Sequence, residues 1–277
     1  MTKWFTIICI RHLKGKRGLE EAKTNIFKDP DRIRVFLEKG GERGSAEKLA
    51  RTLGVALTED PKEAADADVL LRYAKNGLSF ESEGQVLRGD FENLRHRLEK
   101  GRVDHELLVK AAKFKGEKEG LTAIDATAGL GEDSMLLAFA GFNVTLIERD
   151  PIIAALLKDT VRRGTRLRDL SEAAGRMTVV EGDSIEELPK LMDPPDVILL
   201  DPMFPAKKNT GLVKKKFQMI YLLERQSMDE ADLLKAAILA RPRKIVIKRP
   251  AAGPFLGDMK PGYSLSGKTI RYDCIVL

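Results

Sequence analysis

The sequence has few of the residues that build disulfide-rich or metal-centred proteins. Its 277 residues include two cysteines and three histidines, and neither type recurs at a ligand spacing. The absence of a CxxC pair or a cysteine framework argues against a disulfide-stabilised secreted fold and a structural zinc site. We therefore expect no metal, and a reducing, cytoplasmic location in which Cys9 and Cys274 are small buried hydrophobic residues.

Long apolar segments are also missing. The apolar stretch at residues 4–10 is too short to cross a bilayer. A basic segment, residues 11–17, follows it in place of a small-residue cleavage site. The stretch therefore predicts a β-strand rather than a signal peptide, and we expect no membrane partner.

Charge of neither sign is scarce, but the balance is basic. Lysine and arginine number 48 against 42 aspartates and glutamates, a formal net charge of +6. Hydrophobic residues make up 43% of the chain, enough for a sizeable core. A polyanionic partner fits this balance, but a net charge of this size favours one only weakly.

The first 118 residues predict a small α+β N-terminal region, within which residues 1–40 remain unplaced. Residues 31–39 resemble a helix closed by Gly40-Gly41. Ser45 resembles the N-cap of a second helix that Gly54 stops. Asn76-Gly77 lies between two alternating segments and predicts a β-hairpin, and residues 91–114 are typical of helix with a break at Gly101.

Residues 119–277 predict a second domain in which strands alternate with helices. This rhythm is typical of a Rossmann-like, doubly wound α/β sheet. The expected strands are 121–126, 143–147, 177–180, 197–200 and 244–247, with an end pair near 264–266 and 270–277. The expected helices are 132–140, 151–163, 184–192 and 228–240.

A glycine turn follows the first of these strands. Gly129 and Gly131 allow a ligand to approach the backbone, and the helix behind them offers free N–H groups. The dinucleotide spacing G-x-G-x-x-G fails because residue 134 is serine. Asp125 precedes the turn, where a carboxylate suits an ammonium group and repels a pyrophosphate. The pattern favours S-adenosylmethionine (SAM) over NAD.

Further acids follow the next two strands. Glu148, at the end of the second strand, is placed to bind ribose hydroxyls, and Asp183, after the third, to accept from an adenine amino group. Taken singly, such acids are more often structural, at a helix N-terminus, since Pro151 and Ser184 begin helical patterns. Together with Asp125 they favour a nucleoside site.

The fourth strand ends in Asp201-Pro202-Met203-Phe204. A carboxylate, a fixed carbonyl and an aromatic ring suit a flat base with an exocyclic amino group, so we expect Asp201, Pro202 and Phe204 to be catalytic. Phe204 as core filler is the alternative. Basic side chains follow, either as a solvated face or as contacts to RNA phosphates: Lys207, Lys208, Lys214, Lys215, Lys216, Lys248 and Arg249.

In combination, these motifs resemble the RsmJ family of SAM-dependent class I methyltransferases, which modify a guanine N2 of 16S ribosomal RNA. The similarity rests on segments 125–133, 148–157, 200–205, 212–215, 248–250 and 271–273. It implies 16S ribosomal RNA or the small ribosomal subunit as partner. The family's glycine-rich segment is reduced here to Gly101. The resemblance implies SAM contacts at Glu132, Asp133, Glu148, Arg149, Asp183, Ser184 and Asp201.

Two other functions remain open. An acid-proline-x-aromatic turn can hold any planar amide or amine, so an amino-methyltransferase acting on DNA or on a protein glutamine fits the same residues. A ribosome-assembly protein that binds RNA without catalysis is a third possibility. The intact Asp201 and the glycine turn argue against that third possibility.

Overall fold

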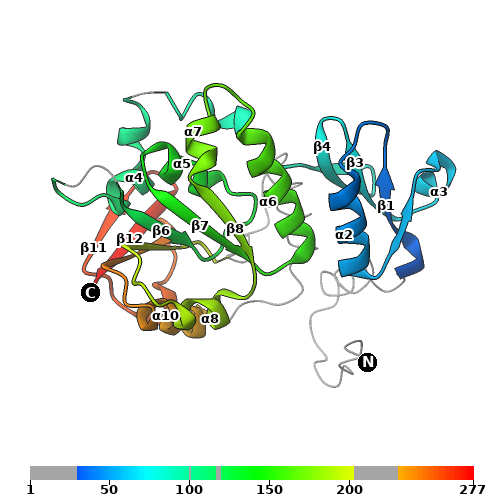
Figure 1. Cartoon of the computed structure of the whole chain (residues 1–277). Helices are drawn as coiled ribbons and strands as arrows, with labels where there is room; N and C mark the ends of the chain where they lie inside the picture. The colour runs from blue at the N-terminus through cyan, green and yellow to red at the C-terminus, as the bar shows by residue number, and fades with distance from the viewer. Residues whose placement is uncertain (1–29, 100, 117–119, 203–229) are drawn as a thin grey trace, which may run out of the picture.

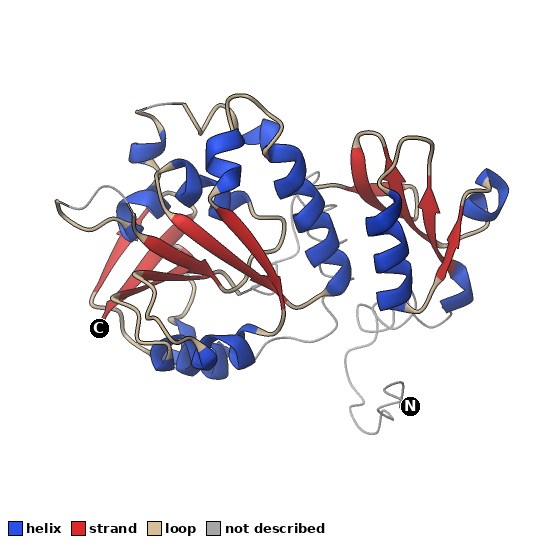
Figure 2. Ribbon diagram, viewed as in Figure 1, coloured by secondary structure: helices blue, strands red, loops and turns tan. Residues whose placement is uncertain are grey.

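The computed structural model describes residues 30–99, 101–116, 120–202 and 230–277, and these form two β-sheets (Figures 1 and 2). The strand predicted over residues 4–10 lies outside the described residues. The predicted domain boundary, at residue 118, falls between the two sheets. Residues on its N-terminal side, including Phe91, Leu94 and Leu108, nevertheless pack into the core of the second sheet.

The N-terminal sheet has five strands in the order β2-β1-β3-β4-β5. Strand β1 is parallel to both of its neighbours, β2 and β3, and β3, β4 and β5 follow as antiparallel hairpins. Its elements are η1 (Pro30–Arg32), β1 (Ile33–Leu37), α2 (Arg43–Leu53), β2 (Ala56–Thr58), α3 (Pro61–Ala65), β3 (Val69–Ala74), β4 (Gly77–Ser82) and β5 (Gln85–Leu87).

The hairpin and the glycine stop are confirmed here, whereas two other predictions are wrong. Ala74 pairs with Gly77 across a turn at Lys75-Asn76, and Gly54 caps α2 in the left-handed conformation. The predicted helix over residues 31–39 is instead strand β1. The N-cap of α2 is not Ser45 but Glu42, whose carboxylate accepts from the Ser45 N–H.

The second sheet has seven strands in the order β11-β12-β10-β9-β6-β7-β8. The five from β10 to β8 are parallel, and β12 is antiparallel to both β10 and β11. This confirms the predicted doubly wound α/β fold. The strands are β6 (Thr122–Asp125), β7 (Asn143–Glu148), β8 (Met177–Glu181), β9 (Val197–Leu200), β10 (Lys244–Pro250), β11 (Tyr263–Ser266) and β12 (Ile270–Val276).

Helices cover both faces of this sheet. In β9, Val197 and Leu199 enter one core with α4–α7, while Ile198 and Leu200 enter another with α8 and α10 (Figure 1). The predicted helix over 91–114 is two short 3-10 turns and α4. The helical elements are η2 (Phe91–Leu94), η3 (Val103–His105), α4 (Leu107–Ala112), α5 (Glu132–Phe139), α6 (Pro151–Gly164), α7 (Ser171–Gly175), α8 (Ser184–Glu187), η4 (Leu188–Lys190), α10 (Glu230–Leu239) and η5 (Leu256–Asp258).

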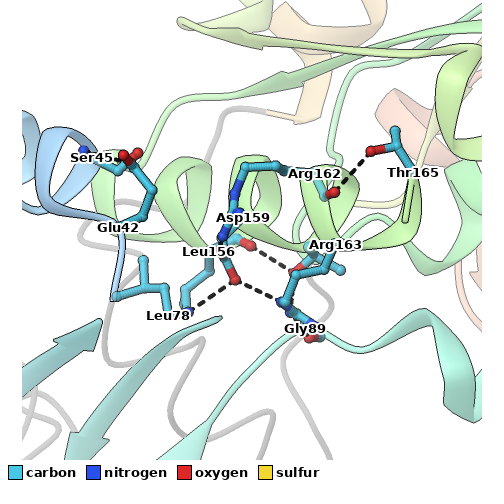
Figure 3. Close-up of polar contacts among 10 residues, drawn as sticks. Glu42, Ser45, Leu78, Gly89, Leu156, Asp159, Arg162, Arg163 and Thr165 are labelled. Carbon is cyan, nitrogen blue, oxygen red and sulfur yellow. Dashed lines mark hydrogen bonds and ion pairs between the residues drawn. The ribbon is translucent and has the colours of Figure 1, made fainter. Parts of the chain in front are cut away.

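Helix α6 joins the two sheets. Its Ile152, Ile153 and Leu156 pack into the core of the N-terminal sheet. The Asp159 side chain, 4% exposed, accepts the Leu78 N–H and pairs with Arg163, which donates to the Gly89 carbonyl (Figure 3). The junction is therefore apolar at its centre and fixed by a buried carboxylate.

Within the part of the chain that the structure describes, no helix is long and apolar enough to cross a membrane. In the same residues, no group of three or more histidine, cysteine, aspartate or glutamate side chains gathers as a metal site would require.

Candidate active site at the carboxyl edge of the large sheet

Four neighbouring parallel strands, β9, β6, β7 and β8, end at one edge of the large sheet. Asp125 and Glu148 are the last residues of β6 and β7, Asp201 directly follows β9, and Asp183 comes two residues after β8. The sequence-predicted acids therefore lie along a single edge, where open α/β sheets bind their ligands.

Asp125 organises the glycine turn from within. Its side chain is buried, with Oδ2 accepting from the Ser134 hydroxyl at 2.5 Å and Oδ1 from the Thr127 N–H at 3.1 Å. Burial raises the pKa of this carboxyl to about 7, and the nearby Asp133 adds to the rise, while the Ser134 hydrogen bond opposes it. Asp125 thus supports the turn, and its carboxyl is only partly ionised near neutral pH.

The two glycines of the turn have different physical requirements. Both have positive φ, +53° at Gly129 and +77° at Gly131. A Cβ on Gly131 would lie 2.7 Å from Leu157 Cδ1, so close packing excludes a side chain there. Among the described residues, no atom lies within 4 Å of a Cβ position on Gly129. The backbone at Gly129 is therefore open to a ligand.

Glu148 connects the second strand to this turn. Its Oε2 accepts the Gly129 N–H at 3.0 Å and its Oε1 accepts the Asp150 N–H at 2.9 Å. The side chain is 7% exposed, so the carboxylate is fixed in place beside the open glycine. A carboxylate of this kind accepts hydrogen bonds from hydroxyl groups, which is the chemistry that a diol ligand needs.

Asp183 and Ser184 have structural bonds of their own. Asp183 caps α8 by accepting the Ile185 N–H, and the buried Ser184 hydroxyl donates to the Ala126 carbonyl at 2.6 Å. Glu132, at the start of α5, and Arg149, after Glu148, are half-buried at the same edge. The alternative interpretation of Asp183 as a helix cap is thus correct, and it leaves the ligand role open.

Thr127 and Lys248 link Asp201 to the rest of the edge. The Thr127 hydroxyl accepts the Asp201 N–H at 2.7 Å, a contact that the sequence analysis missed. The Lys248 ammonium lies 2.6 Å from Asp133 Oδ2 and 2.9 Å from Asp201 Oδ2. Burial opposes the charge of Lys248, but Asp133 and Asp201 raise its pKa above the ordinary value.

The predicted RNA contacts Lys248 and Arg249 point to opposite faces of β10. Lys248 shares a face with Val246, on the α5 side, and Arg249 with Ile247, on the α10 side. The Arg249 side chain is fully buried and pairs with Glu230 at 2.9 Å. This position does not suit a phosphate contact, and we exclude Arg249 from the proposed RNA surface.

Pro202 is buried directly after Asp201. The catalytic candidate Phe204 and the lysines at 207, 208, 214, 215 and 216 lie outside the described residues. A further residue that the sequence analysis left without a role is Arg271, which donates to the carbonyls of Pro250, Ala251 and Gly253. It holds the loop after β10, and its pairing with Asp273 two positions on was the available signal.

Comparison with known proteins assigns the chain to a family. Residues 57–277 match the family model described as "Putative SAM-dependent methyltransferase". Relatives named ribosomal RNA small subunit methyltransferase J include one from Pseudomonas syringae pv. syringae, 39% identical over 251 residues, which cover 87% of this chain and 90% of the relative. The chain belongs to this SAM-dependent methyltransferase family.

Two further comparisons agree with the assignment. The relative of the same name from Thioalkalivibrio sulfidiphilus is 37% identical over 88% of this chain and 98% of its own. The crystal structure of a SAM-dependent methyltransferase from Neisseria gonorrhoeae has a TM-score of 0.68 and 27% identity, over 88% of this chain and 95% of that one. The fold is that of the class I methyltransferases.

SAM is the cofactor of this family, and the edge fits it. Asp133 and Asp201 share one ammonium, that of Lys248, so this group of three side chains carries a net negative charge. SAM carries a sulfonium and an α-ammonium, which such a field attracts. The open backbone at Gly129 beside the fixed Glu148 provides room and acceptors next to that charge.

Proposed function

We propose that this protein transfers a methyl group from SAM to the exocyclic N2 of a guanine in small-subunit (16S) ribosomal RNA. The observation that carries the proposal is the similarity, over nearly full length, to relatives named ribosomal RNA small subunit methyltransferase J. The position of Asp201-Pro202 beside the acid edge supports it. The proposed partner is 16S ribosomal RNA or the small subunit, and the proposed location is the cytoplasm.

The proposed cofactor contacts follow from the edge. The backbone at Gly129 and Gly131, the start of α5 at Glu132 and Asp133, and the Glu148-Arg149 pair would hold SAM. Asp183 and Ser184 would border its adenine, while Asp125 contributes charge from behind the turn. When bound, SAM supplies an electrophilic methyl group on a sulfonium sulfur that leaves as a neutral thioether.

The chain's own task is to position the amine. The guanine N2 lone pair is delocalised into the ring and must be turned towards the methyl group. The Asp201 carboxylate and the Pro202 carbonyl would accept the two amino protons and achieve this, and Asp201 would take the proton that N2 loses. Positioning of this kind can supply up to about 7–11 kcal/mol of a bimolecular barrier. Phe204 would stack on the base, which must be unstacked from its neighbours.

Transfer from tritium-labelled SAM tests the proposal. Purified protein is incubated in parallel with 16S ribosomal RNA, with small subunits, with duplex DNA and with a glutamine-containing protein extract. Label in RNA alone is the expected result. Label in DNA or protein would support the amino-methyltransferase alternatives, and SAM binding without transfer to any of them would support an RNA-binding assembly protein.

A further inference from the structure

Lys248 is placed by the alternation of β10 where two carboxylates converge. It is on the α5 face of the strand, which brings its ammonium to Asp133 at the start of α5 and to Asp201 after β9. The three side chains are 25%, 15% and 39% exposed. They are close enough to solvent for a substrate to reach Asp201, yet sheltered enough for the pairing to matter.

We propose that Lys248 is a positioning residue for methyl transfer, whose ammonium bridges Asp133 and Asp201 and thereby keeps the Asp201 carboxylate charged and in one orientation. This replaces its expected role as an RNA phosphate contact, because its ammonium contacts two acids of the site, Asp133 and Asp201. The inference rests on the proposed function in treating Asp201 as the acceptor for the target amine.

Charges from every neighbouring element act on Asp201. Asp133 of α5 and Asp125 of β6 carry charge of the same sign and disfavour the ionised form of Asp201. Lys248 and Arg249 of β10 favour the ionised form of Asp201. The buried Tyr272 of β12 lies in register with Lys248, and the charge of Arg97 acts on Tyr272 and Asp133.

Burial and Asp133 raise the pKa of Asp201, while Lys248 holds it down. Among these groups, Lys248 alone both opposes the rise and donates a hydrogen bond to the Asp201 carboxylate.

Without the Lys248 ammonium, Asp133 and Asp201 would face each other with no cation between them. A cation beside a carboxyl group commonly lowers its pKa by about 1–3 units, so loss of the Lys248 ammonium should raise the pKa of Asp201. A larger fraction of Asp201 would then be protonated at neutral pH and unable to accept the amino proton. The defect is therefore one of protonation, and a rise in pH should reverse it.

The first test compares pH profiles of kcat for wild type, Lys248→Met and Lys248→Arg. We expect the acidic limb of the Met variant to move up by about one unit or more, so that kcat falls about tenfold near pH 6 and recovers near pH 9. The Arg variant keeps the charge and should restore most of the profile. Lys190→Met, which removes an exposed lysine paired with Glu187, is the matched control and should leave kcat unchanged.

RNA binding separates this role from phosphate contact. The slope of log RNA affinity against log salt should be the same for Lys248→Met and wild type, whereas a lost phosphate contact would flatten it by about 0.7. An unshifted acidic limb, or a flattened slope, overturns the inference. A second neutral variant, Lys248→Gln, guards against a folding defect specific to methionine. If Lys248→Met and Lys248→Gln both prevent folding while Lys248→Arg folds, the ammonium charge is structural and the inference is likewise overturned.

A direct titration of Asp201 does not depend on the substrate. The ¹³C carboxyl resonance of Asp201, identified by its loss in Asp201→Asn, is followed against pH in wild type and in Lys248→Met. The midpoint should rise in the variant. A wild type that fails to methylate RNA would overturn the proposed function alone, while an unmoved midpoint would overturn the role of Lys248 alone.

Discussion

At the scale of single residues, the acids that we propose to bind SAM also hold the backbone of the edge. Glu148 binds two N–H groups, Asp125 binds the turn and a hydroxyl, and Asp183 caps a helix. These bonds fix the carboxylates before any ligand arrives. Their structural roles therefore support the cofactor contacts that we propose for them.

Replacement of Glu148 by alanine should weaken SAM binding. A lost hydrogen bond to a charged group costs roughly 1.5–3 kcal/mol, and the Gly129 N–H would lose its acceptor as well. Titration calorimetry measures the change. Glu181→Ala is the control. Glu181 is the residue of β8 that lies opposite Glu148 in the strand register, but it is exposed. Unchanged affinity in a folded Glu148→Ala protein would refute the ribose assignment.

Asp125 should make stability depend on pH. Its pKa is raised to about 7 in the folded protein, so the unfolded chain releases this proton first as pH rises from about 4. Its contribution to stability therefore falls between about pH 4 and pH 7 and is level above that. Urea unfolding of wild type and Asp125→Asn across this range should show a smaller loss in the variant. Parallel curves would contradict the shift.

At the scale of secondary structure, the sequence predicted the large sheet better than the N-terminal one. In residues 121–202 and 230–277 the apolar runs are separated by glycine or proline, so the strands and helices there are recognisable locally. Residues 31–39 mix Ile33, Val35 and Leu37 with helix-favouring charges. They form a strand because β2 and β3, which come later in the chain, pair with both of its edges. A local pattern does not contain those partners.

The candidate site was also predictable only in part. Acids at strand ends could be found from the chain because parallel strands place their carboxyl ends together. Grouping Lys248 with Arg249 was wrong because adjacent residues of a strand point to opposite faces. The alternation of side chains along β10 would have placed Lys248 and Arg249 on different faces. The contact between Lys248 and Asp133 could not be predicted, because it depends on where α5 packs.

The junction at α6 should be sensitive to Asp159. Its buried carboxylate accepts the Leu78 N–H and pairs with Arg162 and Arg163. Asp159→Ala leaves these groups without their partner, and breaking a buried pair costs roughly 3–5 kcal/mol. Chemical denaturation measures the loss. Asp232→Ala, in an exposed pair with Lys235, should cost under about 1 kcal/mol. Equal losses in both variants would contradict the role of the junction.

At the scale of the whole molecule, the net charge is +6, although the carboxyl edge of the large sheet is acidic. The excess of lysine and arginine therefore lies elsewhere in the chain. The chain has no comparable acidic run to match Lys207–Lys216. We expect this segment to meet RNA phosphates.

Replacement of Lys214, Lys215 and Lys216 by glutamine should flatten the salt dependence of RNA binding. Each phosphate contact on single-stranded RNA contributes about 0.7 to the slope of log affinity against log salt, so the slope should fall by up to about two units. SAM affinity should not change. The control replaces the exposed lysines 62, 190 and 235, which changes net charge equally. The same flattening in both triple variants would mean that net charge, and not this segment, drives binding.

The central claim is methylation of guanine N2 in 16S ribosomal RNA, with Asp201 holding the amine. Mass spectrometry of nucleosides and fragments from 16S ribosomal RNA, treated with SAM and either wild type or Asp201→Ala, tests it most directly. We predict N2-methylguanosine at one position with wild type and none with the variant, which should keep a native circular dichroism spectrum. A methyl group on another atom, or variant activity within about twofold of wild type, under 0.5 kcal/mol, would contradict the account.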